Sequence, residues 1–137
     1  MKYQRLALLL AGIEIGVVGA IYLFAPRFMV ESNGMKIITV SDFHSVRAAY
    51  GGAFVGFAAL FLYGALREHI RHAALVSLAV LMTAFACGRI FSLLVDGIPA
   101  KAYLGALASE VVFAAAAFWL LRQGPGEENA AALTSSP

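Results

Sequence analysis

The chain has 137 residues, of which 61% are hydrophobic, and its formal net charge is +2. Its mean hydropathy is +0.83, whereas a soluble domain is nearer about 45–50% apolar. The basic residues are scattered and form no phosphate-binding stripe, so the composition gives no support for nucleic acid as a partner. A single cysteine, Cys87, excludes an intramolecular disulfide or a C-x-x-C redox centre. The composition therefore predicts a protein whose solvent is the lipid bilayer.

The hydrophobic residues concentrate in four segments of 20, 21, 23 and 20 residues, at 6–25, 46–66, 73–95 and 102–121. A hydrocarbon core about 30 Å thick needs about 20 helical residues, so each segment can cross once. Each is expected to be a helix, because lipid offers backbone polar groups no water to bond. The predicted fold is all-α: a four-helix transmembrane bundle with up-down topology, in one membrane domain over 1–122.

The first segment begins like a signal peptide but contains Glu14 and lacks a small-residue cleavage site, so we interpret it as a retained span. Pro26 is expected to end this helix, because its ring cannot continue the preceding turns. A turn is predicted at 32–34, and Ser41 or Asp42 is expected to cap the second helix.

The remaining connections are short. Residues 68–72 are polar and are interpreted as a link between two antiparallel helices. Asp96-Gly97 predicts a second turn, and Pro99 suits the first turn of the fourth helix. The segment 123–137 is rich in polar and small residues and is predicted to be a disordered tail.

Each apolar segment contains one charged residue: Glu14, Arg47, Arg89 and Glu110. A charge at the centre of a membrane helix costs at least about 2.5–3.5 kcal/mol, so such residues are normally paired or line a cavity. Arg89 is expected to pair with Asp96 or Glu110. Because two acids and two bases on four helices rarely all meet, we expect Glu110 to be only partly paired.

Residues at helical spacing add polar side chains to the same faces. The resulting candidate cluster opens towards the outer side and contains Glu14, Arg47, Tyr50, Arg89, Ser92, Asp96, Tyr103 and Glu110. Two interpretations stay open. The cluster binds an ion, a proton or a small polar ligand, or its ion pairs only lock the helices together.

Small residues form a second pattern, with Gly12 and Gly16 on the first helix and Gly52 and Gly56 on the second. Glycines spaced by four let helix backbones approach closely. This pattern fits packing within the chain, or a seam to a second copy or another membrane protein.

No catalytic, cofactor or metal motif stands out. The three histidines lie outside the apolar segments, and the His69–His72 pair lacks the further ligands that a metal site needs. We therefore expect no metal and no cofactor, and an enzyme acting on a lipid or quinone is the least supported function.

Three stretches carry a resemblance to a known family: 46–52 (VRAAYGG), 88–99 with Gly88-Arg89 and Asp96-Gly97, and Ser109-Glu110. Together they resemble the bacterial domain-of-unknown-function 4345 family over roughly residues 5–122. The resemblance implies a four-span membrane protein without an established activity. In outline the chain is also similar to DoxX-like four-helix membrane proteins.

The resemblance implies a multi-pass protein of the bacterial inner membrane. Orientation follows from the basic residues near the ends of the helices. One side has Lys2, Arg5, Arg67, Arg71 and Arg122, and the other has Arg27, Lys36 and Lys101, with Arg47 at the interface. This bias predicts both termini in the cytoplasm.

Overall fold

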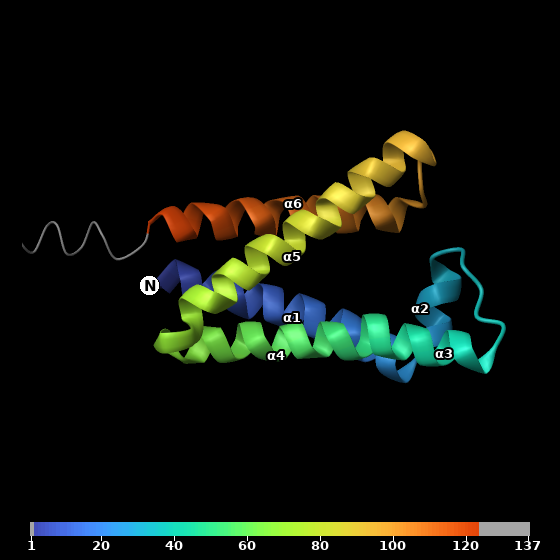
Figure 1. Ribbon diagram of the computed structural model, residues 1–137, viewed down its shortest axis with the longest axis horizontal. Helices are drawn as coiled ribbons and strands as arrows, with labels where there is room; N and C mark the ends of the chain where they lie inside the picture. The colour runs from blue at the N-terminus through green and yellow to red at the C-terminus, as the bar shows by residue number, and fades with distance from the viewer. Residues whose placement is uncertain (1, 124–137) are drawn as a thin grey trace, which may run out of the picture.

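The computed structural model describes residues 2–123, and within this range every regular element is helical. In chain order the elements are α1 (Lys2–Phe24), α2 (Pro26–Ser32), α3 (Val40–Val46), the π-helical turn η1 (Arg47–Gly52), α4 (Ala53–Leu66), α5 (Glu68–Val95) and α6 (Lys101–Arg122) (Figure 1). The predicted all-α fold is confirmed. Apart from Gln123, the predicted polar tail lies outside the described residues.

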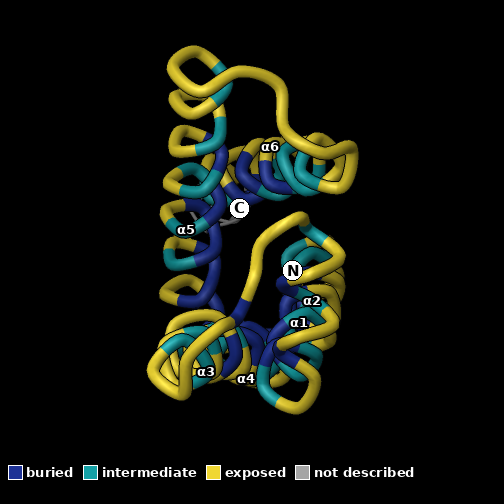
Figure 2. The backbone as a smooth tube through the Cα atoms, turned by 90° about the vertical axis from the view of Figure 1, so that its right-hand side faces the viewer, coloured by how far each residue is buried: buried dark blue, intermediate teal, exposed yellow. Residues whose placement is uncertain are grey.

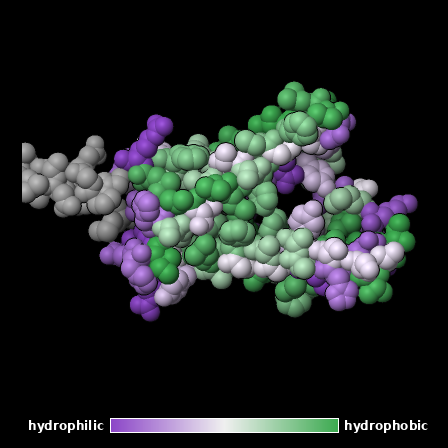
Figure 3. All heavy atoms as spheres, viewed as in Figure 1, coloured by the Kyte–Doolittle hydropathy of each residue, from purple (hydrophilic) through white to green (hydrophobic). Residues whose placement is uncertain are grey.

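Four helical stretches are long and apolar enough to cross a membrane: Lys2–Phe24, Val40–Leu66, Glu68–Val95 and Lys101–Arg122. Large apolar side chains such as Leu10, Val80 and Val112 point outward from these helices. Hydrophobic residues cover the middle of the face in Figure 3, and hydrophilic residues gather towards the ends. Such an outer surface is stable in lipid and indicates a multi-pass membrane protein.

The helices pack as two hairpins: α1 lies along α4, and α5 lies along α6 (Figure 1). Viewed end-on, the buried backbone faces inward between the two pairs (Figure 2). The buried core joins them through Leu8 and Phe61 of the first hairpin and Leu75, Leu78 and Ala117 of the second. α5 lies close to α4 at the joint between them and diverges from it towards the C-terminal end of α5 (Figure 1). At that end of the molecule, the space-filling view is hollowed between the two hairpins (Figure 3).

Glycines bring α1 and α4 together. A Cβ atom added at Gly12 would lie 2.8 Å from Leu62 Cγ, and one added at Gly19 would lie 2.8 Å from Phe54 Cβ. At Gly16 it would lie 3.2 Å from Ala58 Cβ. These glycines therefore pack within the chain, as one of the two interpretations expects. A Cβ at Gly56 would meet nothing within 4 Å, and a contact with a second copy stays a prediction.

The connection from α1 to α4 contains two short helices. Pro26 is the first residue of α2, where its missing N–H costs nothing. The helix that leads into α4 is capped by Thr39, not by Ser41 or Asp42 as expected. The Asp42 N–H donates to Thr39 Oγ1 at 3.2 Å, and the Thr39 N–H donates to Asp42 Oδ2 at 2.8 Å. This is a capping box, so Asp42 takes the third helical position.

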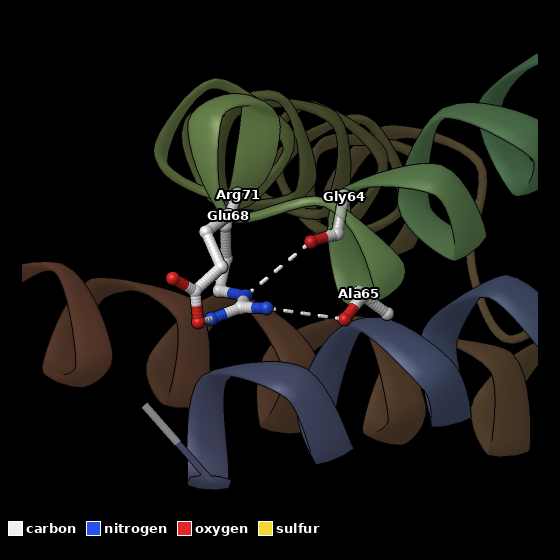
Figure 4. Close-up of polar contacts among 4 residues, drawn as sticks. All are labelled: Gly64, Ala65, Glu68 and Arg71. Atoms are coloured by element: carbon white, nitrogen blue, oxygen red, sulfur yellow. Dashed lines mark hydrogen bonds and ion pairs between the residues drawn. The ribbon is translucent and has the colours of Figure 1, made fainter.

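The predicted link at 68–72 is wrong, because α5 begins at Glu68 and only Arg67 separates it from α4. Arg71 explains the difference (Figure 4). Its Nε donates to the Gly64 carbonyl at 3.3 Å and its Nη2 to the Ala65 carbonyl at 3.2 Å. A buried guanidinium thus satisfies the last carbonyls of α4, which have no partner within their own helix.

The second predicted turn is present, with Gly97 at a φ of +94°, a conformation that glycine adopts without a steric penalty. Pro99 was expected in the first turn of the fourth helix. It instead lies in the connection, since α6 begins at Lys101.

Candidate functional site

A cavity of about 100 Å³ lies where the four long helices meet. Its polar residues are Glu14, Arg89, Ser109 and Glu110, and its apolar walls are Ile15, Val18, Phe54, Met82, Phe85 and Ala106. The walls come from α1, α4, α5 and α6, so the arrangement of both hairpins determines its shape. The volume gives room for a few water molecules or one small ion.

Arg89 and Glu110 form an ion pair in this cavity. Arg89 Nε lies 2.8 Å from Glu110 Oε1 and 2.9 Å from Oε2. The Glu110 side chain is only 7% exposed, and the guanidinium carbon of Arg89 lies 5.3 Å from the centre of the Tyr103 ring. The predicted carboxylate partner of Arg89 is confirmed and is Glu110. The expected partial pairing of Glu110 is wrong, because both carboxylate oxygens accept from Arg89.

Glu14 lines the same cavity, but it is exposed whereas Glu110 is buried. Within residues 2–123 the Glu14 carboxylate forms no ion pair and accepts no side-chain hydrogen bond. If all three groups are ionised, two carboxylates face one guanidinium, and the cavity carries a net negative charge. A negative cavity of this size favours a proton or a small cation over an anion.

Two members of the predicted cluster, Ser92 and Asp96, do not line this cavity. The Ser92 hydroxyl donates to Asp96 Oδ2 at 2.8 Å, and this pair is exposed at the end of α5. Asp96 therefore takes Ser92 as its partner and does not pair with Arg89. Ser92 lines a separate groove of about 240 Å³ between α5 and α6, together with Arg89 and Tyr103.

Arg47 and Tyr50 also find partners outside the cavity. Arg47 Nε donates to the carbonyl of Leu23 at 3.1 Å, in the last turn of α1. Tyr50 stacks on Tyr22 with ring centres 5.2 Å apart. Both residues belong to η1, where the backbone widens into a π-helical turn. Such a turn changes the angular spacing of side chains, so the regular helical spacing used for the sequence prediction fails here.

Several residues that line the cavity were not predicted from the sequence. Phe54, Phe85 and Ser109 line the cavity, but in sequence they look like ordinary residues of apolar helices. No group of three or more metal-ligating side chains is found in the described part of the chain. The polar groups that line the cavity are two carboxylates, one guanidinium and one hydroxyl.

The model of the family called domain of unknown function (DUF4345) matches residues 3–121. The chain belongs to the DUF4345 family. The match covers the four long helices except Lys2 of α1 and Arg122 of α6, and it includes every cavity residue, so the cavity is built within the DUF4345 domain. Searches among curated proteins and among solved structures found no match to this chain.

Proposed function

We propose that this DUF4345 protein binds a proton or a small cation at Glu14 inside the membrane and serves as a binding or transport protein. The observation that carries the proposal is the position of Glu14. It lines a cavity in which Arg89 and Glu110 already satisfy each other. A carboxylate left without a partner in a membrane span is costly, and binding a proton or cation offsets that cost.

The second candidate is a structural or accessory membrane protein in which the charges only lock the helices. The specific observation that favours it is the tight Arg89–Glu110 pair, which joins α5 to α6 and is covered by Tyr103. The two candidates differ at Glu14. A lock needs no accessible carboxylate there, whereas a binding site does.

Carbodiimide labelling separates the candidates, because carbodiimides modify carboxyl groups only when these are protonated. We expect a hydrophobic carbodiimide to modify Glu14 in the purified protein, as mapped by mass spectrometry. Sodium or potassium ions should slow the reaction if the site accepts a cation. Glu14→Gln should abolish the adduct, and Glu31→Gln, which removes an exposed carboxylate on α2, should leave it unchanged. An unreactive Glu14 between pH 5 and 8 would support the lock instead.

We also propose the bacterial inner membrane as the location, with both termini in the cytoplasm. The N-terminal end of α1 and the C-terminal end of α6 lie at the same end of the molecule (Figure 1). Lys2 and Arg5 are in the first turn of α1, Arg67 joins α4 to α5, and Arg122 ends α6, so these basic residues lie at that end. Their position supports a cytoplasmic location for it. The α2–α3 connection would then face the opposite side.

A further inference from the structure

A second group of basic residues lies outside the cavity, where α2 and α3 pack beside the end of α1. The guanidinium carbons of Arg27 and Arg47 lie 5.6 and 5.7 Å from the centre of the same Phe43 ring. Both guanidinium groups thus form cation–π contacts with the same ring. This arrangement gives a positive site that is independent of Glu14.

Arg47 is held in place by the hydrogen bond from its Nε to Leu23. Its two terminal nitrogens donate to no acceptor among residues 2–123. Among the described residues, the one acid that contacts Arg27 is Glu31, at a long 3.7 Å, and both side chains of that pair are more than half exposed. Asp42, the other nearby acid, is engaged by the backbone of Ile38 and Thr39. The guanidinium groups therefore keep donors available for an anionic ligand.

The surroundings of these arginines are apolar and open. A groove of about 400 Å³ is lined by Val40, Phe43, His44 and Arg47. Val40 of this groove is 74% exposed, and Ile38, two residues before it in the chain, is 81% exposed. Ile38 and Val40 lie at the start of the second span-long stretch, Val40–Leu66, where the headgroup region of a bilayer meets its hydrocarbon core.

We propose that Arg27 and Arg47 bind the phosphate of an anionic phospholipid whose acyl chain covers Ile38 and Val40. Charge complementarity selects the phosphate, because guanidinium groups recognise phosphate oxygens with charge-assisted hydrogen bonds. The exposed aliphatic side chains select a lipid over a free anion, because a free anion would leave them in water. The occupant is a phospholipid of the leaflet that surrounds α2 and α3.

The test measures lipid binding to the purified protein in detergent micelles by native mass spectrometry. The probes are dioctanoyl phosphatidylglycerol, dioctanoyl phosphatidylcholine and inorganic phosphate. We expect the wild type to bind the phosphatidylglycerol more tightly than the phosphatidylcholine. Each basic residue near an anionic headgroup contributes a factor of about five, so Arg27→Gln combined with Arg47→Gln should weaken phosphatidylglycerol binding about 25-fold.

Arg5→Gln combined with Arg122→Gln is the matched control, because it removes the same charge from the opposite end. It should leave the preference for phosphatidylglycerol intact. Since Arg47 also contacts the end of α1, Arg27→Gln alone is the second variant and should weaken binding about fivefold. Equal binding of both lipids by the wild type would overturn the proposal. So would competition by inorganic phosphate, or an equal loss in the control.

Discussion

Arg89 of α5 donates from a single nitrogen, Nε, to both carboxylate oxygens of Glu110 on α6. The same guanidinium group lies over the ring of Tyr103, so Arg89 contacts both an acid and an aromatic ring of α6. Both partners belong to the second hairpin. The pair therefore ties α5 to α6 where these helices diverge from α4. Among the described residues, it leaves Glu14, the other acid that lines the cavity, without a counter-ion.

Arg89→Ala should destabilise the fold by about 3–5 kcal/mol, because the buried Glu110 carboxylate would lose its partner. Unfolding in detergent micelles by heat or denaturant measures this loss. Glu110→Gln combined with Arg89→Ala should recover part of it, since no uncompensated buried acid remains. An unfolding midpoint equal to that of the wild type in Arg89→Ala would show that the pair does not stabilise the fold.

Arg71→Ala should destabilise the fold by about 2–3 kcal/mol, because hydrogen bonds from a charged donor to the carbonyls of Gly64 and Ala65 would be lost. Arg71→Lys should recover little, since an ammonium group cannot reproduce the planar fork of the guanidinium. The control is Arg67→Ala, which removes an exposed arginine from the same joint. Comparable losses in Arg67→Ala and Arg71→Ala would contradict the capping role.

Gly19→Ala and Gly56→Ala should have opposite effects. At Gly19 the new methyl group would lie 2.9 Å from the Val55 backbone nitrogen, so the two helices must separate, at a cost of about 1–3 kcal/mol. At Gly56 nothing lies within 4 Å, and alanine should stabilise the helix by about 0.5–1 kcal/mol. Both are measured by thermal unfolding. A destabilised Gly56→Ala variant would point to a partner on that face.

Cysteine accessibility tests the proposed orientation. In a Cys87→Ser background, Met35→Cys should react with a membrane-impermeant maleimide added to intact cells, and His69→Cys should react only after the membrane is broken. Both positions are exposed in the structure. The reverse pattern would place the two termini outside the cytoplasm.

The spans could be predicted from the sequence because hydropathy reports the free energy of transfer into lipid directly. The segment 102–121 differs from α6 by one residue at each end. The start of α5 could not be predicted in this way. Four of the five residues at 68–72 are polar, and hydropathy does not register that the Arg71 side chain folds back onto the end of α4.

The candidate site was only partly predictable for a related reason. Charged residues in apolar segments identify which side chains need partners, and Glu14, Arg89 and Glu110 do line one cavity. The choice of partner depends on how each helix is rotated about its axis. The π-helical turn at η1 changes that rotation for Arg47, and the divergence of α5 leaves Asp96 at the surface with Ser92.

Because α5 is joined to α4 at Arg67, a change of angle at this joint displaces the far end of α5 most. Only one residue separates α4 from α5, and Arg71 clamps this corner, so the hairpins share a pivot at one end. With 28 residues, α5 is about 42 Å long. A rotation of about 5° at the pivot would move its far end by about 4 Å. Small angular changes at a corner distant from Glu14 would thus change the distance between α5 and α1, which both line the cavity.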